Sequence, residues 1–138
     1  MAPVLGVHLA ATWMLVGLIW TIQIVAYPQF LRVGEGEFTR YHFAHCWRIG
    51  LLIAPLLVVE ALSAGWLLYE GHRERVLLIS IGLILVNWLC TATIQAPLHV
   101  KLMRGFDAGT VRRLILSNWL RTVSWTARGV LIGYVVAG

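Results

Sequence analysis

The chain has 138 residues, of which 59% are hydrophobic and only 12% are charged, and its formal net charge is +5 at pH 7. This composition excludes a soluble globular domain of the same size, and the length leaves room for one domain, residues 1–138. The basic residues are scattered over short segments between hydrophobic runs and form no nucleic-acid-binding motif, so we expect no nucleic-acid partner. The expected surroundings are membrane lipid.

The hydrophobic runs predict four transmembrane helices, each close to the ~20 residues that cross the hydrocarbon core of a bilayer. Their approximate spans are 4–27, 46–69, 76–99 and 114–136. The first run has no basic segment before it and contains Trp13, Trp20 and Gln23, which is unlike a cleavable signal peptide. We therefore expect it to remain in the mature protein.

The connections between these runs are short, which predicts an all-α, integral membrane, up-down four-helix bundle. Pro55 and Pro97 predict kinks, because proline cannot donate a helical hydrogen bond. Asp107 or Thr110 is expected to cap the last helix at its N-terminus.

Basic residues predict the orientation of the bundle. Seven of them belong to the first and third connections and their flanks, and two belong to the middle connection. The two groups are Arg32, Arg40, Arg48, Lys101, Arg104, Arg112 and Arg113, against Arg73 and Arg75. Because basic loops stay in the cytoplasm, we expect both termini on the opposite side.

Each predicted helix gathers most of its polar residues on one face, as counted at about 100° per residue. In chain order the faces contain His8, Thr12, Gln23 and Tyr27; His42, His45 and Glu60; Asn87, Thr91, Gln95 and His99; and Asn118, Arg121, Trp125 and Arg128. Polar groups within a membrane are costly unless they face the bundle interior and find partners, which makes these residues candidates for function. The alternative is hydrogen bonding between helices without any chemistry.

Depth along each span, at ~1.5 Å per residue, divides these residues into two layers. Glu60 and Arg128 share a depth near the middle of the membrane, and we expect a buried ion pair. The second layer lies toward the cytoplasmic end and contains Tyr27, His42, His45, Gln95, His99, Asn118 and Arg121. Since these residues come from all four helices, we expect a ligand-binding cleft there.

Three histidines at one level, His42, His45 and His99, are compatible with a transition-metal site or a haem site. The alternative is that they are interfacial or hydrogen-bonded histidines, since the spacing matches no HExxH or Glu-x-x-His pattern. Cys46 and Cys90 lie in different runs without CxxC spacing and are expected to be free thiols.

Residues of these types could receive a small lipophilic molecule with a few polar groups, such as a quinone, a polyketide or a porphyrin. The candidate catalytic residues are Glu60, His99 and Arg121, because arginine binds an anionic or carbonyl oxygen and the other two can move a proton. The candidate ligand-binding residues are Tyr27, Gln95, Asn118, Trp125 and Arg128. No catalytic triad, phosphate-binding glycine loop or carboxylate pair is present.

Three stretches carry a resemblance to known proteins: residues 17–28 (GLIWTIQIVAYP), Gln95-Ala-Pro-Leu-His99 with residues 104–107, and Asn118-Trp-Leu-Arg-Thr122 with residues 125–128. They resemble an uncharacterised family of short bacterial four-helix integral membrane proteins. The resemblance implies the fold and a multi-pass position in a bacterial inner membrane, with periplasmic termini if the orientation above holds. A weaker similarity, in size, helix count and a late Asn-plus-Arg pattern, is to anthrone-oxygenase-like membrane proteins, and it transfers no catalytic residue.

Two functions stay open from the sequence. The first is a small membrane oxidoreductase that acts on a lipophilic substrate, with haem or a metal as a candidate cofactor. The second is a non-catalytic subunit or lipophilic-ligand-binding component, as a homo-oligomer or in a larger membrane complex. Proton or ion passage through the layer of His8, Glu60 and Arg128 is disfavoured, since four helices leave little room for alternating access.

Overall fold

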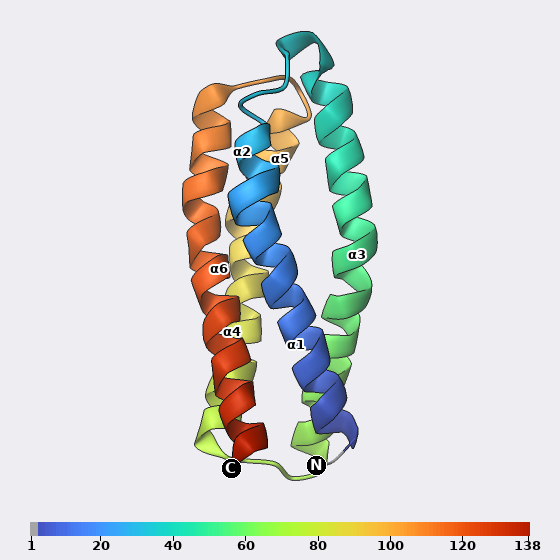
Figure 1. Ribbon diagram of the computed structural model, residues 1–138, viewed down its shortest axis with the longest axis vertical. Helices are drawn as coiled ribbons and strands as arrows, with labels where there is room; N and C mark the ends of the chain where they lie inside the picture. The colour runs from blue at the N-terminus through green and yellow to red at the C-terminus, as the bar shows by residue number, and fades with distance from the viewer. Residues whose placement is uncertain (1–2) are drawn as a thin grey trace.

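The computed structural model describes residues 3–138, and within that range it is all-helical, as predicted, with no strand. Four long helical segments lie side by side (Figure 1). In chain order they are α1 (Pro3–Thr21) continued by η1 (Ile22–Ala26) and α2 (Tyr27–Gln29); α3 (Glu35–Tyr69); α4 (Arg75–Cys90) continued by η2 (Thr91–Gln95) and α5 (Ala96–Leu102); and α6 (Ala108–Ala137).

The helix starts follow local chemistry. α3 begins at Glu35, well before the predicted apolar span that starts at residue 46, and it has Glu35 and Glu37 in its first turn. Negative side chains there interact favourably with the helix dipole, and this amphipathic start is invisible to hydropathy. α6 begins after Asp107, whose carboxylate accepts a hydrogen bond from the Thr110 N–H at 2.9 Å. Of the two capping candidates, Asp107 is therefore the N-cap.

The first and third segments each contain one π-helical turn just before a proline. η1 leads into Pro28 and η2 leads into Pro97. A proline removes one hydrogen bond and its ring crowds the preceding turn, and a wider turn is one way in which the helix continues past it. The expected interruption at Pro97 is present in this form, whereas α3 continues through Pro55 as an α-helix. The two π-helical turns contain the buried Gln23 and Gln95.

The order of packing in the bundle leaves one side open. α1 packs against α3 and α6, and α6 packs against α4. α3 and α4 follow each other in the chain, but their backbones come close at few positions along their length. The main apolar core includes Leu15, Ile19 and Leu114, and α3 contributes the buried Phe38 and the partly buried Ile53 to it.

The outer surface of the helices is strongly apolar. Exposed side chains include Phe43, Leu62, Leu85, Leu116 and Val123, each more than 60% exposed. Three segments, Pro3–Gln29, Glu35–Tyr69 and Arg75–Leu102, are long and apolar enough to cross a membrane by length and composition. The fourth predicted span lies within α6, which forms as a helix but does not reach the same hydropathy.

Candidate functional site

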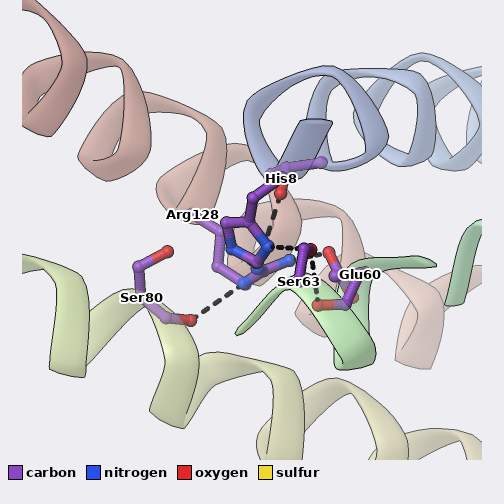
Figure 2. Close-up of polar contacts among 6 residues, drawn as sticks. His8, Glu60, Ser63, Ser80 and Arg128 are labelled. Carbon is purple, nitrogen blue, oxygen red and sulfur yellow. Dashed lines mark hydrogen bonds and ion pairs between the residues drawn. The ribbon is translucent and has the colours of Figure 1, made fainter. Parts of the chain in front are cut away.

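A fully buried ion pair joins α3 to α6 (Figure 2). The Arg128 guanidinium donates to the Glu60 carboxylate, and its Nε donates to the Ser80 carbonyl oxygen of α4 at 2.8 Å. Both side chains have no exposed surface. The pair predicted from equal depth is confirmed, and a hydrogen bond from the same guanidinium ties α4 to it as well.

α1 completes this layer through His8. Its Nδ1 lies 2.7 Å from the Ser63 hydroxyl and its Nε2 lies 3.4 Å from Nη2 of Arg128. The Ser63 hydroxyl in turn donates to the Glu60 carbonyl oxygen at 3.1 Å. Figure 2 shows the side chains of His8, Glu60, Ser63 and Arg128 converging on one buried point, where the main-chain carbonyl oxygen of Ser80 from α4 also meets Arg128. We call the polar layer formed by His8, Glu60, Ser63 and Arg128 the charged layer.

A second polar group lies where α2 and α5 are placed, at the end of the bundle opposite the two termini (Figure 1). The Tyr27 hydroxyl is 3.0 Å from Nε2 of His99, and Nδ1 of His99 is 2.9 Å from Nε2 of His42. The Cys46 Sγ lies 3.7 Å from that His42 atom and 3.6 Å from that His99 atom. His42, Cys46 and His99 are thus placed so that they could hold a metal ion.

His45 does not join this group. Its ring instead packs edge-on against Phe30, with the ring centroids 4.9 Å apart, and lies near Tyr27. Cys46, four residues after His42, is rotated about 40° from it around the axis of α3. His45, three residues after His42, is rotated about 60° in the opposite direction. The predicted trio is therefore corrected by replacing His45 with Cys46, a residue that we expected to be only a free thiol.

Two of the predicted ligand-binding residues hydrogen-bond between helices. The Asn118 amide donates to the Gln23 side-chain oxygen at 2.8 Å, and the Thr122 hydroxyl reaches the same oxygen at 3.2 Å. The Gln95 amide donates to the Ser117 hydroxyl at 2.9 Å. This is the alternative role of polar residues in a helix bundle, the joining of helices. The two π-helical turns supply Gln23 and Gln95 to these hydrogen bonds between helices.

An apolar cleft of about 540 Å³ lies on the side where α3 and α4 are loosely packed. It is lined by Ile53, Ala54, Leu57, Val58, Ala61, Leu62, Trp88, Thr91, Ala92, Arg121 and Trp125. These residues belong to α3, α4, η2 and α6, and we call this space the lateral cleft. Small alanines on α3 and η2 leave room for it.

Arg121 and Trp125 are lining residues of the lateral cleft that carry polar groups, in a surface that is otherwise almost entirely apolar. The guanidinium carbon of Arg121 lies 5.3 Å from the centre of the Trp125 ring, a cation–π contact. Nε of Arg121 and Nε1 of Trp125 are buried and have no hydrogen-bond partner within residues 3–138. A buried unpaired donor is costly, and an acceptor that entered beside the Arg121 guanidinium would reduce this cost.

The seven residues expected to form one cytoplasmic-side cleft do not lie together around a single space. Of the seven, only Arg121 lines the lateral cleft, together with Trp125. Tyr27, His42 and His99 belong to the hydrogen-bonded group that also contains Cys46. Gln95 and Asn118 join helices, and His45 packs against Phe30. Arg128, which was expected to bind ligand, is occupied by Glu60. No family model, no curated protein and no solved structure matches the chain, so the evidence for its function lies in these groups.

Proposed function

We propose that this chain is a four-span integral membrane protein whose lateral cleft binds a lipophilic molecule with a carbonyl or anionic oxygen, and that it acts on this molecule as an oxidoreductase. The observation that carries the proposal is a buried arginine with an unpartnered Nε in the wall of an otherwise apolar cleft. The membrane, the ligand and the reaction are each supported by a separate feature of the bundle.

Membrane insertion of all four helices is supported by where the charges of α6 point. Arg121 is 5% exposed and Arg128 has no exposed surface, so the residues that lower its hydropathy face the protein interior. Its outer face presents Leu116, Val123 and Val130, which are each at least 60% exposed. A helix with this division can span a bilayer, since only its apolar face meets lipid.

The proposed orientation places both termini in the periplasm of a bacterial inner membrane. The termini lie together at one end of the bundle (Figure 1), and the more basic connections lie at the other end. Reporter fusions test this directly. A fusion at Gly138 is expected to give a periplasmic signal and a fusion at Gly105 a cytoplasmic one, and a cytoplasmic C-terminus would overturn the orientation.

The chemistry of the lateral cleft supports a lipophilic ligand. Its volume of about 540 Å³ falls within the range of roughly 300–1,000 Å³ that small-molecule sites occupy. An apolar body would pack against the aliphatic lining from α3, while Arg121 would donate to an oxygen of the polar head. Quinones, polyketides and porphyrins combine these two features.

Oxidation or reduction is proposed because all three ligand classes undergo it and because groups that exchange protons are close by. The hydrogen-bonded series of Tyr27, His99 and His42 could pass a proton to or from a bound oxygen. Glu60 is left out of this role, since its carboxylate is engaged by Arg128.

Binding is tested with the detergent-purified protein and a short-chain ubiquinone analogue, which quenches tryptophan fluorescence when it binds beside Trp88 and Trp125. Arg121→Gln is expected to weaken binding about tenfold or more, as the loss of a charged hydrogen bond implies. The matched control is Arg112→Gln, an exposed arginine on the same helix. Equal affinities for the two variants would refute a role for Arg121.

The reaction is tested by aerobic oxidation of the corresponding quinol, with molecular oxygen as electron acceptor. A rate above that of the protein-free solution supports an oxidoreductase. Binding without turnover supports the second candidate, a non-catalytic ligand-binding subunit of a membrane complex. That candidate is favoured by the Gln23, Asn118 and Thr122 hydrogen bonds, which join helices and leave fewer polar groups for chemistry.

A further inference from the structure

We propose that His42, Cys46 and His99 form a binding site for a thiophilic transition-metal ion, Zn(II) or copper, at the end of the bundle that holds α2 and α5. The inference does not require the lipophilic ligand, because none of these three residues lines the lateral cleft. It goes beyond the proposed function, because a metal bound to the two imidazole nitrogens would take the place of the hydrogen bond between His42 and His99.

The three donor atoms already form a triangle of suitable size. Its sides are 2.9 Å between the two imidazole nitrogens and 3.7 and 3.6 Å from the Cys46 Sγ to each of them. A tetrahedral metal with bonds of about 2.0–2.1 Å to nitrogen and about 2.3 Å to sulfur keeps its donors roughly 3.3–3.6 Å apart. The sulfur distances nearly match this value, and the two nitrogens need to separate by only a few tenths of an ångström.

A hydrogen bond orients the His99 imidazole for such a role, whereas the His42 imidazole is held by aromatic packing and its buried Nδ1 has no partner among the described residues. When Nδ1 of His99 binds a metal, its proton resides on Nε2, where the Tyr27 hydroxyl lies at 3.0 Å as the acceptor. A hydrogen bond of this kind from the remote nitrogen is typical of metal-binding histidines. The His42 ring is stacked on Phe38, with centroids 5.5 Å apart, and meets the edge of Phe30 at 5.2 Å.

The type of donor decides the class of metal. One thiolate and two imidazoles, without a carboxylate, suit zinc and copper and do not suit magnesium or calcium. The rings of His42 and His99 are nearly parallel, with an interplanar angle of 26° and facing nitrogens 2.9 Å apart. A haem would have to place its iron and porphyrin plane between these two nitrogens, which are already in hydrogen-bond contact, so this pair favours a small ion over a bis-histidine haem.

Three protein ligands leave one coordination position for water or a substrate, as in catalytic zinc sites. Cys46 is half-buried and lines a groove on α3 together with Trp47, Gly50 and Pro55. Ala54 and Val58 line both this groove and the lateral cleft, so the two spaces adjoin. An open position at the metal would therefore face a region that a ligand from the membrane can reach.

The test uses the full chain, purified in detergent and stripped of metal with a chelator. Titration with Co(II), a spectroscopic substitute for zinc, is expected to show one equivalent bound with a thiolate-to-cobalt charge-transfer absorption. Cys46→Ser should abolish this absorption. Tyr27→Phe should keep the absorption and lower the affinity about 10- to 100-fold, as loss of an orienting hydrogen bond does. His45→Ala is the matched control and should behave as the parent protein.

The proposal is overturned if Co(II) does not bind, if Cys46→Ser leaves the spectrum unchanged, or if His45→Ala weakens binding as much as His99→Ala. Monodispersity and helicity of every variant are measured first, and Cys46→Ser is nearly isosteric, so its loss of absorption reports on the ligand. Zn(II) and Cu(I) then compete with bound Co(II), which ranks the two ions. Quinone quenching is measured on the metal-free protein, so a failure of the metal site and a failure of the lateral cleft are separate results.

Discussion

Glu60 and Arg128, 68 residues apart in the chain, form an ion pair from which solvent is completely excluded. Breaking such a pair by removing one partner typically costs roughly 3–5 kcal/mol, because the remaining charge stays buried without compensation. We expect Glu60→Gln and Arg128→Gln each to lower thermal stability in detergent strongly. The double variant should lose less than the sum of the two, and a double-mutant cycle measures this coupling.

The surface pair of Glu37 and Arg40 is the matched control, with a 3.0 Å separation and side chains that are 68% and 87% exposed. Its removal should change stability by about 0–1 kcal/mol. If the buried pair also shows no coupling, the charged layer contributes nothing to the stability of the bundle.

A second prediction concerns the close approach of α1 and α6 at Gly129. A Cβ atom built there would lie 3.2 Å from the Trp13 ring and 3.3 Å from a Val16 methyl carbon. Gly133, one turn further along α6, has open space at the same position. Gly129→Ala is therefore expected to melt at a lower temperature than Gly133→Ala, by the roughly 1–3 kcal/mol that overpacking costs. Equal melting temperatures would show that Trp13 moves aside without cost.

Much of this architecture was predictable because helices have a fixed rise and period. Equal depth in two helices that run in the same direction was enough to pair Glu60 with Arg128, since both lie well inside apolar runs. Helix ends were less predictable. The start of α3 at Glu35 depends on an amphipathic segment, and the passage of the first segment through Pro28 depends on a π-helical turn, neither of which raises hydropathy.

The candidate sites were predicted less well, and the reasons differ. Cys46 was predicted only to be a free thiol, since residues three and four positions from His42 both lie near it on a helix and the spacing alone does not choose between His45 and Cys46. The lateral cleft could not be inferred at all. It exists because α3 packs closely only on α1, and no local pattern reports how two long helices separate.

A third prediction uses the cap of α6, which lies outside the proposed spans. Hydrogen bonds from the Thr110 side chain and backbone, with one from Lys101, lower the pKa of Asp107 from 3.8 to about 2. The carboxylate therefore stabilises the fold fully above pH 4, and this contribution is lost as the pH falls from about 4 toward 2. The substitution Asp107→Asn keeps a side chain that can cap the helix but removes the charge.

The measurement compares the melting temperatures of the parent protein and Asp107→Asn in detergent at pH 6 and at pH values approaching 2. The parent should be the more stable at pH 6, and the difference should shrink as Asp107 becomes protonated. A constant difference across this range would mean that the charge of Asp107 makes no contribution.

The last prediction tests the lateral cleft by filling it. Ala61 lies on α3 in the wall of the cleft, so a phenylalanine side chain at this position would occupy space that a ligand needs. Ala61→Phe should weaken binding of the ubiquinone analogue while leaving the helices intact, because the added ring enters existing empty volume and displaces no core residue.

The matched control is Ala10→Phe, at an exposed position on α1. Both variants add the same apolar surface, so partition of the quinone into detergent affects them equally. Unchanged quenching in Ala61→Phe would place the ligand elsewhere, whereas loss of binding in Ala61→Phe and Arg121→Gln together would locate it between α3 and α6.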